Sequence, residues 1–317
     1  MLPLFDKPEI AGVPREDYAA RLQRLATDNI YIGTSSWKYP GWLGSIYTDD
    51  RYRGRRGFSK KRFEQECLAE YAEVFPTVCG DFSFYRFYET PFWDRLFSQV
   101  PANFQFGLKV PQDITTRVWP KLDRHGALAG ARNSSFLDVA RFQAQFTDVL
   151  RPYRDRLGPL IFEFGELSKE SDPNGARDFV EDLGPFLAKL PTGFRYAVEV
   201  RNREFLEPRY FECLRAHNVA HVFNSWTRMP GLAEQLDIPD AVTADFLVSR
   251  ALLRPGRGYK QAVQSFQPYE SIQDPYPEGR ASLERLVTEA RRDQRPAYLY
   301  VNNRLEGNAP ATIEAFT

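Results

Sequence analysis

Short apolar stretches alternate with longer amphipathic ones along most of this chain of 317 residues. In residues 104–110, four apolar side chains alternate with Gln105, Gly107 and Lys109, which is the period of two expected of a β-strand whose faces meet different surroundings. Residues 62–74 instead place apolar side chains at helical spacing. The repeated change between the two periods predicts an α/β fold.

Eight strands are predicted, at about 30–35, 77–84, 104–110, 160–164, 196–201, 220–224, 242–248 and 297–301. Helices are predicted between them at about 62–74, 91–99, 134–151, 174–190, 207–216 and 279–292. Eight strands that alternate with helices predict a (β/α)8 barrel of the TIM type, with a doubly wound open sheet as the alternative. The chain has no G-x-G-x-x-G fingerprint and no Walker-type phosphate loop, so a nucleotide-binding open sheet is disfavoured and no cofactor is predicted.

The ends of the pattern divide the chain into an extension and one domain. Residues 1–28 form a predicted N-terminal extension with an amphipathic helix, and residues 29–317 form a single barrel domain. The Pro-, Gly-, Gln- and Tyr-rich segment at about 254–280 is too long for an ordinary connection, so it is a candidate insertion or lid.

Composition excludes several classes of protein. The 42 basic and 42 acidic residues cancel, which removes a global attraction to nucleic acid or to an anionic membrane. The scattered cysteines and histidines predict neither a disulfide framework nor a metal site; they are Cys67, Cys79, Cys213, His125, His217 and His221. No apolar run approaches the ~20 residues of a membrane helix and no signal peptide is visible, so we expect a cytoplasmic protein with no membrane partner.

The candidate chemistry lies where strands end, because ligands of such barrels bind at the C-terminal ends of the strands. Glu199 and Arg201 share one face of a predicted strand. They are read either as a structural ion pair or as an acid–base group with an anion clamp. Lys109 ends another strand and could bind an anion, form a Schiff base, or pair with Asp81 or Glu199. Together, Glu163 and Glu199 weakly suggest the carboxylate pair of a glycosidase.

The candidate site residues divide into two groups. The catalytic candidates are Glu199 and Lys109. The predicted ligand contacts are Arg201, Arg250, Asn302, Asn303, Asp81, Tyr85 and Trp37. The two aromatic residues could form a stacking platform, although packing in the core is the more common use of such side chains.

Taken in order, these short motifs give the chain a family resemblance from about residue 30 to 310. The motifs are Gly33-Thr34-Ser35-Ser36-Trp37, Tyr39-Pro40-Gly41-Trp42, Phe84-Tyr85-Arg86, Lys109 with Ile114-Thr115, Leu157-Gly158-Pro159, Glu199 with Arg201, Arg250, and Asn302-Asn303. The set resembles the domain-of-unknown-function 72 family, also called YecE-like proteins. The resemblance implies a (β/α)8 barrel and no established activity.

The chain departs from that family pattern in several places. The family usually has Glu-x-Asn where this chain has Cys79 and Asp81, and a His where it has Thr116. It also usually has Gln where this chain has Glu163, and His-Gly where it has Leu252-Leu253. Two His and one Glu are thereby lost, and the remaining set is cationic, which fits anion binding better than metal hydrolysis.

We therefore expect a small phosphorylated or carboxylated ligand held by Lys109, Arg201 and Arg250, with Glu199 as the acid–base group. The alternative is a non-catalytic module that binds nucleic acid or protein through the basic residues of segment 51–62. A metal-dependent hydrolase is a third class, disfavoured because the histidines show no ligand spacing.

Overall fold

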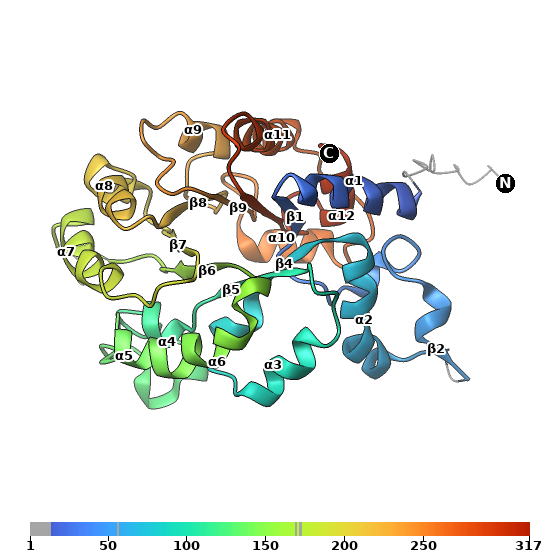
Figure 1. The fold of residues 1–317 in the computed structure, drawn as a ribbon, viewed down its shortest axis with the longest axis horizontal. Coiled ribbons are helices and arrows are strands. Elements are labelled where there is room, and N and C mark those ends of the chain that lie inside the picture. The colour runs from blue at the N-terminus through green and yellow to red at the C-terminus, as the bar shows by residue number, and fades with distance from the viewer. Residues whose placement is uncertain (1–13, 56, 169, 171–172) are drawn as a thin grey trace.

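A closed barrel of eight parallel strands forms the centre of the molecule, and helices surround it (Figure 1). This computed structural model describes residues 14–55, 57–168, 170 and 173–317. Around the barrel the strands follow the order β1-β10-β9-β8-β7-β6-β5-β4. Their bounds are β1 (Ile30–Thr34), β4 (Thr77–Gly80), β5 (Gln105–Lys109), β6 (Leu157–Glu163), β7 (Tyr196–Glu199), β8 (Ala220–Asn224), β9 (Leu247–Ala251) and β10 (Ala297–Val301). The closed order confirms the predicted (β/α)8 barrel and excludes the open sheet.

Most of the helices connect successive strands, while the first precedes β1 and the last follows β10. A short hairpin of β2 (Arg53–Gly54) and β3 (Gly57–Phe58) precedes the second helix. Their bounds are α1 (Arg15–Thr27), α2 (Lys60–Val74), α3 (Thr90–Phe97), α4 (Gln112–Thr115), α5 (Val139–Phe142), α6 (Asp148–Leu150), α7 (Ala176–Leu187), α8 (Pro208–Ala216), α9 (Leu232–Leu236), α10 (Tyr259–Phe266), α11 (Pro277–Arg292) and α12 (Ala309–Glu314). Among the described residues, no helix is both long and apolar enough to cross a membrane.

Several predicted elements have different bounds in the structure, among them the strand expected at 196–201, which ends at Glu199 and leaves Arg201 beyond it. The strand expected at 77–84 ends at Gly80, because the chain turns into a 3-10 helix over Asp81–Phe84. The strand expected at 242–248 begins only at Leu247, which moves Arg250 from the loop into β9. The helix expected at 134–151 begins at Val139, where the Asp138 side chain accepts a hydrogen bond from the Arg141 N–H and caps it. A π-helical turn over Gln143–Thr147 then separates α5 from α6.

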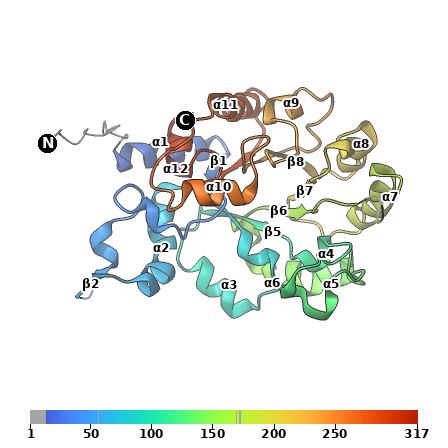
Figure 2. The ribbon, with the colours of Figure 1, turned by 180° about the vertical axis from the view of Figure 1, so that it is seen from behind.

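Both predicted additions to the barrel pack against it. In the N-terminal extension, residues 1–13 lie outside the described residues, while α1 buries Tyr18, Leu22 and Leu25. In the segment 254–280, α10 lies beside α12 in both views (Figure 1, Figure 2). Its Phe266 belongs to a small apolar cluster with Leu253, Ala262 and Tyr269, against which Tyr39 and Trp226 pack. The inserted segment therefore covers loops at the strand ends of β1 and β8.

The barrel interior is filled by side chains that recur at every second strand residue. They form a separate buried cluster of Cys79, Ile161, Ala197, Ala220, Val222, Ala244, Phe246, Val248, Tyr298 and Tyr300. On β5 the inward position between Gln105 and Lys109 is Gly107, where an added Cβ would lie 2.2 Å from the Tyr300 hydroxyl oxygen. A glycine at this position therefore leaves the space that the Tyr300 ring fills.

We expect Gly107→Ala to lower the free energy of unfolding by about 1–3 kcal/mol, because an extra methyl group forces a close-packed ring to move. Urea denaturation measures this value. The matched control is Gly165→Ala, since an added Cβ there has no neighbour within 4 Å. An equal loss of stability in the two variants would contradict the packing argument.

His221 on β8 is a buried imidazole outside the barrel interior. Its Nδ1 is 3.1 Å from the Tyr210 hydroxyl and its Nε2 is 3.3 Å from Gln235 Oε1. Desolvation lowers its pKa to about 4, although the hydrogen bond to Gln235 opposes this shift. Because the pKa is lower in the folded state, the unfolded chain takes up a proton at His221 below about pH 6.5 while the folded chain does not, and stability is lost as the pH falls from there toward 4.

We expect His221→Gln to reduce the loss of stability between pH 7.5 and pH 4.5 by about 2–3 kcal/mol, since glutamine has no proton to take up. Urea denaturation at both pH values gives the difference. The same substitution at the partly exposed His217 serves as the control. An unchanged pH dependence in the His221 variant would show that other groups cause the acid sensitivity.

Candidate functional site

Six charged side chains meet at the C-terminal ends of the barrel strands, and we call them the mouth cluster. They are Asp81, Lys109, Glu163, Glu199, Arg201 and Arg250. Each follows an inward-facing residue by two or four positions, as Glu163 follows Ile161 and Arg250 follows Val248. The period of two therefore places the cluster directly above the packed interior of the barrel.

Glu199 forms the buried base of the mouth cluster. Its side chain is 0% exposed. One carboxylate oxygen lies 2.6 Å from Arg201 Nη2, and the other lies 2.6 Å from Arg250 Nη1. Asn224 on β8 adds a hydrogen bond, because its Oδ1 accepts from Arg201 Nη1 at 3.3 Å. Both guanidinium groups are thereby fixed from below.

Glu163 is the hub of the cluster, because a single oxygen contacts all three cations. Its Oε2 lies 3.0 Å from Lys109 Nζ, 3.1 Å from Arg201 Nη2 and 2.5 Å from Arg250 Nη1. Burial alone would raise the pKa of Glu163, yet the three cations hold it well below its usual range. The carboxylate is therefore ionised at neutral pH.

Asp81 closes the cluster on the solvent side. Its Oδ1 lies 3.6 Å from Lys109 Nζ and 3.1 Å from Arg250 Nη2. With 35% of its side chain exposed, Asp81 is far more accessible than Glu163 at 15%. Asp81 is thus the carboxylate in the cluster that can move away at the lowest cost.

Two aromatic rings each cover one cation of the mouth cluster. The Lys109 ammonium lies 4.0 Å from the centre of the Phe84 ring, and the Arg201 guanidinium lies 4.2 Å from the Trp226 ring. Cation–π contacts of this kind hold a charged group in place at a partly dry site. Burial opposes the charge on Lys109, but Glu163 and Asp81 outweigh it and raise the lysine pKa, so the amine stays protonated.

Three positive and three negative groups balance in this site. From the sequence the set was expected to be cationic. Glu163 and Asp81 act as counter-ions through contacts between different strands, which the sequence does not show. The convergence itself was predicted: Glu199, Lys109, Arg201, Arg250 and Asp81 all meet in one cluster. The other interpretation of Glu199 and Arg201, a structural ion pair, also agrees with the structure, since every charged group of the cluster has an oppositely charged partner.

Four predicted contacts lie outside this cluster. Asn302 and Asn303 hold the turn after β10, where their Oδ1 atoms accept from the N–H groups of Arg304 at 3.0 Å and Ala309 at 2.8 Å. Tyr85 is 56% exposed, and no contact joins it to the cluster among the residues described. Trp37 is buried and packs edge-on against the Phe82 ring, with the ring centres 5.9 Å apart.

Sequence reasoning gave too little weight to Glu163. It stands at the end of β6 and pairs in register with Glu199 on β7. The sequence does indicate this role, because the two glutamates occupy equivalent inward positions of neighbouring strands. No group of three or more His, Cys, Asp and Glu side chains suited to a metal ion is present among the described residues.

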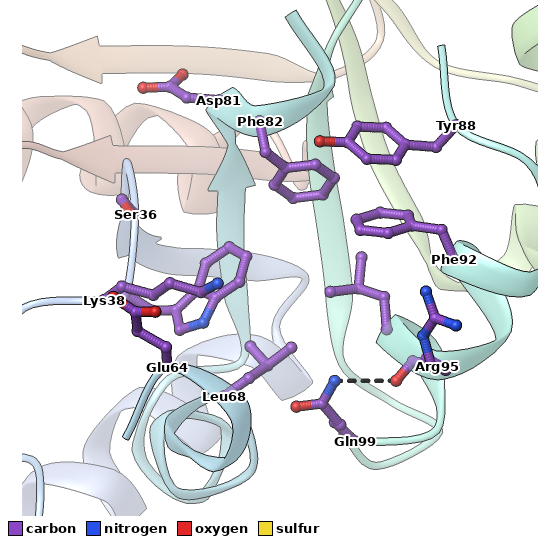
Figure 3. Close-up of a pocket in the computed structure, with 12 residues that line it drawn as sticks. Ser36, Lys38, Glu64, Leu68, Asp81, Phe82, Tyr88, Phe92, Arg95 and Gln99 are labelled. Atoms are coloured by element: carbon purple, nitrogen blue, oxygen red, sulfur yellow. Dashed lines mark hydrogen bonds between the residues drawn. The ribbon is translucent and has the colours of Figure 1, made fainter. Parts of the chain in front are cut away.

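A cavity of about 300 Å³ adjoins the cluster and shares Asp81 with it (Figure 3). It lies between the loop after β1, helix α2 and helix α3, and its lining includes Trp37, Phe82, Tyr88 and Phe92. Asp81 therefore connects the mouth cluster to an aromatic pocket.

The closed barrel with a charged mouth places the protein among the TIM-type barrel proteins that present polar groups at the C-terminal ends of their strands. Residues 31–317 match the family model described as "Protein of unknown function DUF72". The chain belongs to this family.

Solved structures of the same family share the fold. A DUF72 family protein from Thermotoga maritima MSB8 is 20% identical and superposes with a TM-score of 0.60 over 90% of this chain and 97% of that one. A DUF72 family protein from Enterococcus faecalis V583 is 17% identical, with a TM-score of 0.55 over 90% of this chain and 95% of that one. A comparison with curated proteins finds no match.

We expect Glu199→Gln to lower the free energy of unfolding by about 3–5 kcal/mol, because it removes one of the two carboxylates that the buried guanidinium groups of Arg201 and Arg250 share and leaves three buried cations with too little counter-charge. Asp81→Asn removes the same charge from a far more exposed position, so we expect a loss below about 1 kcal/mol. Urea denaturation of the two variants compares them directly. Similar losses would show that Glu199 is less central to the cluster than its contacts indicate.

Proposed function

We propose that the protein binds a small phosphorylated or carboxylated ligand at the mouth of the barrel, in exchange for the side chain of Asp81. The supporting observation is that Asp81, the most exposed carboxylate of the cluster, lies against both Lys109 and Arg250. An incoming anion that takes its place would gain an ammonium group and a guanidinium edge that are already oriented.

The exchange leaves the rest of the cluster intact. Glu199 and Glu163 keep Arg201 and Arg250 in place from below, so the cations need no reorganisation when the ligand arrives. A charge-balanced site also explains how three buried cations are stable without a ligand, since unpaired burial costs several kcal/mol per ion. The carboxylate of Asp81 would thus serve as an internal substitute for the ligand.

Acid–base catalysis has less support than binding. Glu199, the expected acid–base group, is fully buried with both oxygens paired. The lowered pKa of Glu163 and the raised pKa of Lys109 keep both groups charged at neutral pH, whereas an efficient general acid or base titrates near the working pH. A protonated Lys109 is also a poor nucleophile for a Schiff base.

The second expected function, nucleic-acid or protein binding through segment 51–62, gains no support from the contacts. The basic side chains with partners in this segment lie near acids of the same region: Arg51 near Glu73 (3.5 Å), Arg53 near Asp49 (2.5 Å), Lys60 near Glu64 (3.8 Å) and Arg62 near Glu66 (3.1 Å). Arg56 lies outside the described residues. This function stays a prediction from sequence.

If a ligand replaces Asp81, then neutralising the charge of Asp81 should strengthen binding. We expect Asp81→Asn to bind inorganic phosphate and malonate about tenfold more tightly than the unmodified protein, because a neutral amide no longer competes for the cations. Isothermal titration calorimetry at constant ionic strength measures both affinities.

Two further variants make the result specific. Asp50→Asn removes one negative charge from an exposed position on a different loop and should leave the affinity unchanged. Lys109→Gln removes a cation that the anion would contact and should weaken binding. If Asp81→Asn binds either anion no better than the Asp50 variant, the exchange is wrong.

A further inference from the structure

The cavity beside the mouth cluster has features of a ligand pocket that the anion site does not use. Its volume of about 300 Å³ falls at the lower end of the range for small-molecule sites. Asp81 and Ser36 lie at one end, near the barrel mouth, and Gln99 lies at the other (Figure 3). The cavity is therefore an open pocket between the first and second β/α units, distinct from the barrel axis.

Aromatic and aliphatic side chains form its walls. The Phe82 ring packs against Trp37 at 5.9 Å and against Phe92 at 5.4 Å between ring centres. Phe92 is in turn stacked on Tyr88 with ring centres 3.8 Å apart. The place of Phe82 depends on Gly80, because an added Cβ there would lie 2.7 Å from its ring. The rings are thus held in position before any ligand is present, and they offer a flat apolar surface.

Charged groups of both signs surround these walls. Lys38 and Glu64 lie on one side of the cavity, and Arg95 lies on the opposite side (Figure 3). With Asp81 at the mouth end, the lining holds two positive and two negative groups. Such a lining disfavours a ligand with only one kind of charge, since either sign meets a like charge in the pocket. It suits a ligand that carries both.

We propose that this cavity binds a small aromatic zwitterion, the chemical class of the free aromatic amino acids. The ring would lie against Phe82 and Phe92, its carboxylate near Lys38, and its ammonium group near Glu64. The proposal goes beyond the anion site, because the ligand needs no phosphate and its charges are met by residues outside the mouth cluster.

The test compares four probes that differ in one group each: L-phenylalanine, 3-phenylpropionate without the ammonium group, phenethylamine without the carboxylate, and L-alanine without the ring. Ligand-observed NMR titration of the full chain measures the dissociation constants. We expect L-phenylalanine to bind at least about fivefold more tightly than each of the other three, the effect of one charge-assisted hydrogen bond or of the buried ring.

The variants change Lys38, Glu64 and Arg62, which are all exposed, so we expect each variant to fold. Lys38→Gln should remove the preference for L-phenylalanine over phenethylamine, and Glu64→Gln should remove the preference over 3-phenylpropionate. Arg62→Gln, on the same helix as Glu64 but outside the cavity, should change neither. The proposal is overturned if L-phenylalanine does not bind, if the four probes bind alike, or if the Arg62 variant behaves like the other two. Loss of phosphate binding alone would concern only the anion site.

Discussion

The contact of one glutamate oxygen with three cations determines how this barrel can be built. Glu163 Oε2 lies within 3.1 Å of Lys109 on β5, Arg201 just after β7 and Arg250 on β9. Six charges in so small a volume are stable only if each finds its partner, because an unpaired buried ion costs several kcal/mol. A shift of one residue in the register of any of these strands would turn its charged side chain away from the cluster. The network therefore stabilises one alignment of the strands rather than supplying net stability by itself.

The packed interior beneath the cluster imposes a complementary constraint. Tyr300 fills the centre next to Gly107, so buried side chains pack the inside of the barrel beneath the charges. Low-dielectric surroundings on one side strengthen each ion pair and also increase the cost of losing one. This is why Glu199 at the base and Asp81 at the rim, although both are carboxylates facing arginines, have different expected roles. The first is enclosed by protein, while water can replace the second.

The sequence predicts the fold better than the site. Periodicity alone placed strands 220–224 and 297–301 within the observed bounds of β8 and β10. It was wrong at β9, because pairing with β10 begins only at Leu247, although Ala244 and Phe246 before it already pack in the barrel interior. Convergence of the site residues follows from the topology once the strands are known, since the C-terminal ends of all eight strands meet at one rim.

The equal number of positive and negative groups in the mouth cluster could not be predicted from the strand topology. Which carboxylate meets which cation depends on side-chain reach across the barrel, as in the contact of Arg250 on β9 with Asp81 after β4. The same limit applies to Trp37, whose place in the aromatic wall depends on Phe82, a residue with no signal of its own in the sequence. Local patterns report which face a side chain takes, and only the folded chain determines its partner.

Asp81 connects the mouth cluster to the neighbouring cavity, the two parts of the molecule for which we propose ligands. It is the end of the ion network and part of the cavity lining at once. A network that served stability alone would gain little from an edge that is one-third exposed, because solvent weakens the ion pairs there. The rest of the cluster is enclosed by protein and aromatic rings, so the single accessible carboxylate stands at the point where a pocket opens. This arrangement favours a recognition site over a purely structural ion network.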